Sequence, residues 1–216
     1  MKTTQKHNKT LGIILGIFAF LLIAAGITYG LALSDPNPPV AAPVRTDGIV
    51  VRIMQSAVTG EPARLTEDEA SALLFHRISE DKRIQGLRLS VNTDKTVNVY
   101  VPVVYKQLHL GISAVVLPGW DSEAKQMTAD VQSVHIGRLP VPPHWFLSQL
   151  QKTASKEFAV QGNQIRIAPS LLGTIALKNT DIAYVSGLSV SDHAFLIQVK
   201  ADIKSLKNYL DQFLNL

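Results

Sequence analysis

The sequence predicts an α+β protein, in which an N-terminal transmembrane helix precedes an outer domain built of a curved antiparallel sheet wrapped on amphipathic helices. Three observations predict this class. A long uncharged apolar run comes first. Three later stretches place apolar residues at helical spacing, and several others alternate apolar and polar residues as half-buried strands do. The expected order of the outer domain is helix, about four strands, helix, about three strands, helix.

The apolar run extends from Leu11 to Leu33 and follows Lys2, Lys6 and Lys9. Its length of about 23 residues is enough for one helix to cross the hydrocarbon core of a bilayer, which is roughly 30 Å thick. Because positive charge stays on the cytoplasmic side, residues 1–10 are expected to be a cytoplasmic tail. The prediction is a single-pass protein of the cell membrane, with its C-terminal domain outside the cell.

A cleaved signal peptide is the competing interpretation, since Ala32 and Ser34 are small residues of the kind that signal peptidase requires. The apolar run is longer than the roughly 7 to 15 residues of a signal peptide core, which favours a retained anchor. The chain has no cysteine. This excludes a lipoprotein acylated on cysteine, disulfides and cysteine-ligated metals.

The net charge of +4 comes mainly from the N-terminus. The chain has 21 basic and 17 acidic residues, and three of the lysines precede the apolar run. The remainder is therefore almost neutral and has no local basic run. A nucleic-acid partner is not expected, because such a partner requires a basic face.

Residues 34–46 are expected to link the anchor to an outer domain that spans residues 47–216. Four prolines lie in this segment, at positions 36, 38, 39 and 43. A polyproline II spacer of about 3.1 Å per residue would hold the domain on the order of 40 Å from the bilayer. A disordered stalk is the alternative, and both remain open.

The outer domain is expected to start with a short strand over Ile49–Met54 and a helix over Glu67–Ser79. Thr66 and Glu69 have the spacing of a capping box, and Ala70, Leu73 and Leu74 form an apolar stripe. Alternation then predicts strands over residues 87–92, 97–103 and 108–114. A turn is expected at Pro118–Asp121, followed by a fourth strand over Lys125–Arg138, whose poorer alternation indicates a bulge or strong curvature.

The second half is expected to return from helix to strand. The prolines after Leu139 lead into a helix that ends near Phe158. Strands follow over residues 164–168, 174–184 and 189–201, and an amphipathic helix starts at Ile203.

No motif in the outer domain predicts catalysis. Gly111-Ile-Ser113 and Gly187-Leu-Ser189 both lack the second glycine of the serine-nucleophile elbow. The sequence has no glycine-rich phosphate loop. The histidines lack metal-ligand spacing: His76, His109, His135, His144 and His193. The sequence therefore predicts a protein that is not an enzyme and that has no metal and no cofactor.

The chain resembles the YpmS-like membrane proteins of Gram-positive bacteria, a family of unknown function with one N-terminal transmembrane segment. The resemblance covers residues from about 48 to about 201, including "LTEDEASALL" and "VHIGRLPVPPHWFLSQLQK". Its most specific positions lie where a strand ends and a helix follows: Gly137, Leu139, Pro140, Val141 and Pro142. The helix expected from Ile203 departs from the family's usual ending.

The resemblance implies a fold similar to tubular lipid-binding domains, in which an apolar seam between helix and sheet takes an acyl chain. The candidate lipid-binding residues are then Leu73, Leu74, Val99, Val101, Ile112, Trp145, Phe146 and Leu150. The alternative is that these side chains form a closed core. Trp145 is expected to be buried, whereas Trp120 lies in a predicted turn and is as easily exposed as buried.

Two functions follow from these observations. The first is a non-catalytic, membrane-anchored module of the cell envelope that binds a lipid or another hydrophobic ligand. The second is an envelope scaffold or accessory subunit with a closed core that binds another protein. The expected partners are the membrane, a lipid acyl chain and an envelope protein.

Overall fold

The computed structural model describes residues 5–37, 40, 47–79, 82–153, 158–167, 175–177 and 180–201. The described strands form two antiparallel sheets. The smaller sheet has the order β1 (Ala63–Thr66), β11 (Ala194–Ala201), β10 (Thr180–Ser191), β9 (Ile175–Leu177). The larger sheet has the order β2 (Arg88–Val91), β3 (Val97–Tyr105), β4 (Leu108–Asp121), β5 (Gln126–Ile136), β8 (Gln164–Ile167), β7 (Phe158–Gln161), and β6 (Leu139–Val141) also pairs with β5.

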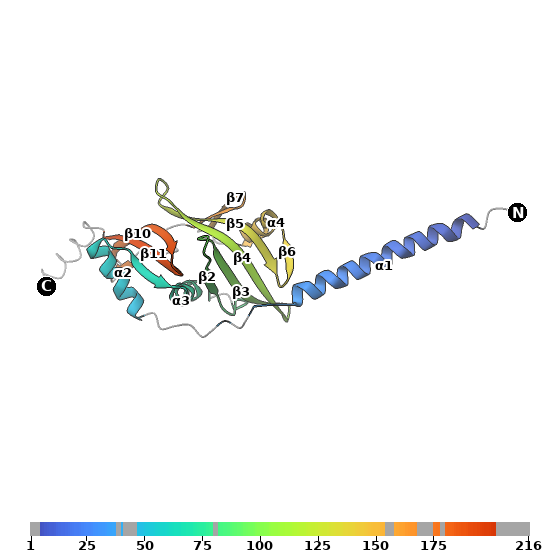
Figure 1. The fold of residues 1–216 in the computed structure, drawn as a ribbon, viewed down its shortest axis with the longest axis horizontal. Helices are drawn as coiled ribbons and strands as arrows, with labels where there is room; N and C mark the ends of the chain where they lie inside the picture. The colour runs from blue at the N-terminus through green and yellow to red at the C-terminus, as the bar shows by residue number, and fades with distance from the viewer. Residues whose placement is uncertain are drawn as a thin grey trace.

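The described helices are α1 (Gln5–Leu33), α2 (Asp47–Thr59), α3 (Glu67–Ile78) and α4 (Pro143–Thr153). Helix α1 projects away from the rest of the chain, as Figure 1 shows. Helix α3 lies between the smaller sheet and strand β2, whereas α4 lies beside β5 and β6 (Figure 1). Helices α3 and α4 therefore cover different parts of the larger sheet.

The predicted fold class is contradicted. Among the described residues, more lie in strands than in helices, and a large antiparallel sheet dominates the chain. The sequence predicts one sheet wrapped on helices behind a transmembrane helix, whereas the strands divide into two sheets. The difference arises because β11 pairs with β1, a strand that the sequence analysis missed, and β10 pairs with β11 and β9, so these strands do not join the meander.

The predicted membrane helix is a second correction. Side chains of α1 are described from Ala19 onward, and large apolar ones such as Phe20 and Ile23 are exposed. Within the described residues, no helix combines the length and the apolar content that crossing a membrane requires. The expected transmembrane helix over residues 11–33 and the expected single-pass localisation in the cell membrane, with a cytoplasmic N-terminus, are therefore contradicted.

Four local predictions also need comment. Residues Ile49–Met54 are helical and belong to α2, so the predicted strand is wrong. Residues Pro118–Asp121 lie within β4, so the predicted turn there is wrong as well. The helix expected from Ile203 lies outside the described residues. The linker is described only at residues 34–37 and 40, so its polyproline or disordered character stays a prediction.

The start of α3 confirms the predicted capping box. The hydroxyl of Thr66 accepts from the backbone N–H of Glu69, and the Glu69 carboxylate accepts from the backbone N–H of Thr66. Glu69 also pairs with Arg52 of α2. The backbone N–H groups of Thr66 and Glu69 at the start of α3 are thereby satisfied, and α2 is tied to α3.

Helix α3 also covers the free edge of β2. The backbone N–H of Leu89 donates to the Ser71 hydroxyl at 2.8 Å, and that of Val91 donates to the Glu67 carboxylate at 2.6 Å. An uncovered edge strand presents unpaired N–H groups that attract another strand. Side chains of α3 therefore take the place of a further strand at this edge.

The apolar interior forms two clusters of buried residues. The first cluster lies between the two sheets around α2 and α3, and Leu65 is among its most buried members. The second cluster lies beneath α4, around Val134 and Leu147. Val116 of β4 packs against both clusters. The interior is therefore continuous through one residue of the larger sheet, although α3 and α4 cover separate parts of it.

Candidate functional site on the two faces of the larger sheet

The strand register gives the larger sheet an apolar and a polar face. Across β2, β3, β4 and β5, one row of directly paired residues is Leu89, Val99, Ala114 and Val134. We call this side the inner face, because α3 and α4 pack on it. The adjacent row, on the opposite side, is Arg88, Tyr100, Ser113 and His135, and we call that side the outer face. Successive strand residues alternate between the faces, which produces this separation.

The inner face holds most of the predicted lipid-binding residues, but it divides them. Leu73 and Leu74 of α3 and Val99 and Val101 of β3 pack against the first cluster. Phe146 and Leu150 of α4 pack against the second cluster. The structure therefore brings the first four together and the last two together, at separate places on the same face.

Ile112 lies between these groups. It pairs with Val101 on one side and with Ile136 on the other. Trp145 is 51% exposed, so the expectation that it is a core residue is wrong. Trp120 is half-buried and pairs with Met127 within β4 and β5.

A strip of half-buried aliphatic side chains occupies the inner face beside Ile112. Val103 and Leu110 pair directly across β3 and β4, next to the pair of Val101 and Ile112. Val103, Leu110 and Ile112 are half-buried, and among the described residues they belong to neither buried cluster. We call these three residues the aliphatic strip. It is a part of the apolar face that the described helices leave incompletely covered.

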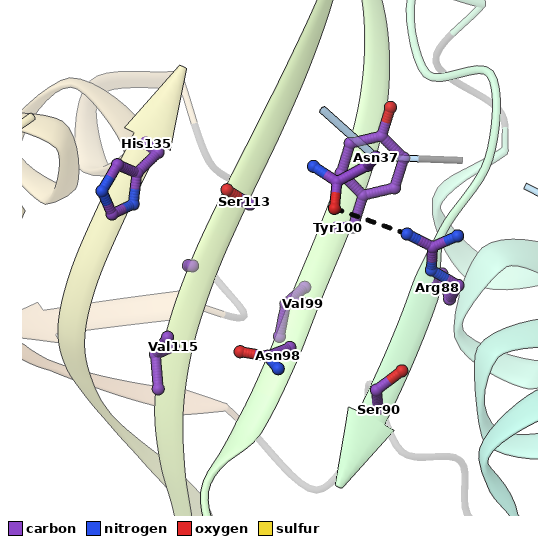
Figure 2. Close-up of a pocket in the computed structure, with 10 residues that line it drawn as sticks. Asn37, Arg88, Ser90, Asn98, Val99, Tyr100, Ser113, Val115 and His135 are labelled. Atoms are coloured by element: carbon purple, nitrogen blue, oxygen red, sulfur yellow. Dashed lines mark hydrogen bonds between the residues drawn. The ribbon is translucent and has the colours of Figure 1, made fainter. Parts of the chain in front are cut away.

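The outer face carries a pocket of about 290 Å³. Figure 2 shows side chains from four neighbouring strands and from the segment after α1 around it. Its lining residues are Asn37, Arg88, Ser90, Asn98, Val99, Tyr100, Ser113, Ala114, Val115 and His135. The sequence analysis missed this site. The polar positions of the alternating strands were a signal for it, because they predict which side chains share a face.

The segment after α1 forms one wall of the pocket. The Tyr100 hydroxyl donates to the Asp35 carboxylate, and Arg88 Nη2 donates to Asn37 Oδ1 at 3.5 Å. The guanidinium of Arg88 also lies 5.1 Å from the centre of the Tyr100 ring. This is within the range of a cation–π contact. Burial and, after it, the hydrogen bond and charge of Asp35 raise the pKa of Tyr100 to about 12.

The end of α1 is fixed on the turn between β5 and β6. The backbone N–H of Arg138 donates to the Leu31 carbonyl at 2.8 Å, which satisfies one of the unpaired carbonyls at the helix end. Gly137 has φ of +58°, and a Cβ there would lie 2.6 Å from the Leu31 oxygen and 2.8 Å from the Ser34 oxygen. Gly137 is therefore required both for its backbone conformation and for the close approach of α1.

Among the described residues, no group of three or more histidine, aspartate or glutamate side chains lies close enough together to hold a metal ion. The inner face offers aliphatic contact and the outer pocket offers hydrogen-bonding groups and a guanidinium. Each face therefore suits a different class of ligand.

Comparison with known proteins adds no relative. No family model, curated protein or solved structure matches the chain.

Proposed function

We propose that this protein is a non-catalytic binding module for an elongated apolar ligand, such as the acyl chain of a lipid. The ligand lies along the inner face of the larger sheet, over the aliphatic strip. The observation that carries the proposal is the half-burial of Val103, Leu110 and Ile112 outside the two buried clusters.

The energetic argument rests on the surface that the strip leaves exposed to water. Removing apolar surface from water contributes about 25 cal/mol per Å², or about 0.8 kcal/mol for each buried CH₂ group. An acyl chain has many such groups and can contact the whole strip, whereas a compact ligand would cover only part of it. The shape and chemistry of the strip therefore favour a chain-like ligand.

We also propose kinship with the YpmS-like proteins, on the residues from Gly137 to Pro142. The tubular lipid-binding fold that this resemblance implies has an apolar seam of the same kind. The proposal for the ligand does not depend on this kinship, because the aliphatic strip supports it directly.

Titration of the full chain with cis-parinaric acid, a naturally fluorescent fatty acid, tests the proposal. We expect saturable binding by the wild-type protein and at least tenfold weaker binding by Ile112→Glu, because a charge on the strip must be desolvated when the ligand covers it. Leu117→Glu is the matched control. Leu117 lies on the same strand and is 40% exposed, so this variant is expected to bind as the wild type does.

The proposal is contradicted if the wild type shows no saturable binding. It is also contradicted if both variants keep the wild-type circular dichroism spectrum and lose binding equally.

The second candidate function is a scaffold that binds another protein. The exposed aromatic side chains of Trp145 and Tyr105 favour it, because aromatic residues are enriched at protein interfaces. A wild-type protein that binds no fatty acid would direct the search to those residues.

A further inference from the structure

We propose that the outer face of the larger sheet carries a track for an extended peptide, and that the segment after α1 occupies this track as a tethered ligand that a partner displaces. The segment is described at residues 34–37 and 40, which we call the docked segment. The proposed partner is another protein that carries an extended segment of the same chemistry, with an aspartate as its main polar anchor.

The sheet provides a position for the aspartate side chain. Gly111 of β4 leaves the necessary room, because a Cβ on Gly111 would lie 2.7 Å from Asp35 Oδ1 and closer still to Oδ2. On the neighbouring strand, the Tyr100 hydroxyl donates to Asp35 Oδ2. A larger residue in place of the glycine would therefore exclude this carboxylate from the position where its donor lies.

The track continues across β2. Arg88 Nη2 donates to Asn37 Oδ1 at 3.5 Å (Figure 2), and Asn37 Nδ2 donates to Asp35 Oδ1 at 3.2 Å. Val40 lies against Gly86, just before β2, since a Cβ there would be 3.0 Å from Val40 Cγ1. The docked segment thus meets β4, β3 and β2 in turn, and glycines make room for it near both ends.

These contacts can open without disturbing the interior. Asp35 is exposed, and Asn37 and Val40 are half-buried. None of these three residues is a member of either buried cluster. Segments with few buried apolar contacts open locally at a low free energy. The docked segment can therefore leave the track while the sheet stays folded.

Unused polar groups beside the track favour displacement by a partner. Asn37 lines the pocket of about 290 Å³ together with Ser90, Ser113 and His135, and these last three side chains make no hydrogen bond within the described part of the chain. A hydroxyl and a neutral imidazole can each donate and accept. A partner segment that also fills the pocket gains hydrogen bonds that the docked segment does not make.

A second copy of this chain is a less suitable occupant. Its segment would make the same contacts on the track as the docked segment makes, and association would also cost translational and rotational freedom. The end of α1 is in addition held on its own sheet, where the Arg138 N–H donates to the Leu31 carbonyl at 2.8 Å. Exchange between copies would have to break this contact, whereas a partner's peptide displaces only the residues that follow α1.

Fluorescence anisotropy of the full chain with a fluorescein-labelled peptide of the sequence SDPNPPV, residues 34–40, tests the inference. The apparent affinity of the wild type is lowered in proportion to the fraction of track that is empty. The double variant Asp35→Ala, Asn37→Ala lacks both polar anchors of the docked segment. We expect it to bind the peptide saturably and at least tenfold more tightly than the wild type does. A peptide with alanine in place of the aspartate should not bind.

Two further substitutions in the double-variant background locate the peptide. Tyr100→Phe removes the donor to the carboxylate and should weaken binding severalfold. Tyr105→Phe is the matched control, because Tyr105 is an exposed tyrosine of the same strand, and it should leave binding unchanged. Asp35→Asn alone replaces the double variant if that variant loses the wild-type circular dichroism spectrum.

The inference is overturned if the folded variant binds the peptide no more tightly than the wild type, or if the two tyrosine substitutions have equal effects. A concentration-dependent dimer of the wild type, absent in the double variant, also overturns it, because the occupant would then be a second copy.

Discussion

Tyr100 joins the larger sheet to the segment that follows α1. Its side chain is buried, its hydroxyl donates to Asp35, and its ring lies under the Arg88 guanidinium. Burial and the neighbouring carboxylate both disfavour the phenolate, and they outweigh the opposite effect of Arg88. The pKa of Tyr100 therefore depends both on the packing of the pocket wall and on the position of the segment after α1.

The raised pKa of Tyr100 gives a prediction at the residue scale. Absorbance titration of the wild type should include a tyrosine with a pKa of about 12, and Tyr100→Phe should remove that step. Because the folded-state pKa lies above the usual value of 10.0, the neutral phenol contributes stability below pH 10 that is lost as the pH rises from about 10 to about 12. Asp35→Asn should lower the pKa of Tyr100. An unchanged titration curve in Tyr100→Phe would contradict the assignment.

Individual residues also show where sequence reasoning was sufficient. Thr66 and Glu69 form the predicted capping box, because all of the contacts lie within one helical turn. The pairing of Arg88, Tyr100, Ser113 and His135 on one face follows from strand alternation. The contact of Asp35 with Tyr100 and the place of Asn37 in the pocket lining could not be predicted, since both depend on where a proline-rich segment far from β3 in sequence crosses the sheet.

At the scale of the element, sequence patterns located the meander and failed for α2. The β-branched residues Ile49, Val50 and Val51 favour a strand, yet the segment is helical. Ile49, Ile53 and Ser56 lie at helical spacing and are the residues that face the interior. Packing against β1 and β11 therefore overrides the intrinsic preference of the segment. The poorer alternation in β5 left a bulge or strong curvature open, and the register shift opposite Val115 and Val116 shows that an irregularity in strand pairing is present there.

Helix α1 gives a prediction at the same scale, through its contact with Gly137. Gly137→Ala should displace the end of α1 and carry Asp35 away from Tyr100, so the pKa of Tyr100 should fall. Gly162→Ala is the matched control, because Gly162 has φ of +63° but nothing within 4 Å of a Cβ. Both variants carry backbone strain of about 1 kcal/mol. An equal pKa of Tyr100 in the two variants would show that Gly137 does not hold the helix end.

At the scale of the whole molecule, the two buried clusters share Val116 and one continuous sheet. The larger sheet has an apolar face and a polar face, and the two clusters pack at different places on the apolar face. We therefore expect ligand binding on the inner face to require both clusters to be folded, because both include residues of the same sheet.

This continuity predicts a single unfolding transition. Leu65→Ala in the first cluster and Leu147→Ala in the second should each lower the free energy of unfolding by about 2–5 kcal/mol, because each side chain is almost fully buried. Urea denaturation followed by both fluorescence and circular dichroism should show coincident transitions in each variant. Two separated transitions, with each variant shifting only one of them, would show that the clusters fold independently.

The most direct test of the central claim, that the inner face binds an apolar chain, is native mass spectrometry of the full chain. We expect the wild type to retain one adduct with the mass of an acyl-chain compound, distinct from the additives used in purification. Ile112→Glu should lose this adduct, and Leu117→Glu should keep it. A wild-type spectrum of bare protein alone, or an adduct that persists unchanged in Ile112→Glu, would contradict binding at the aliphatic strip.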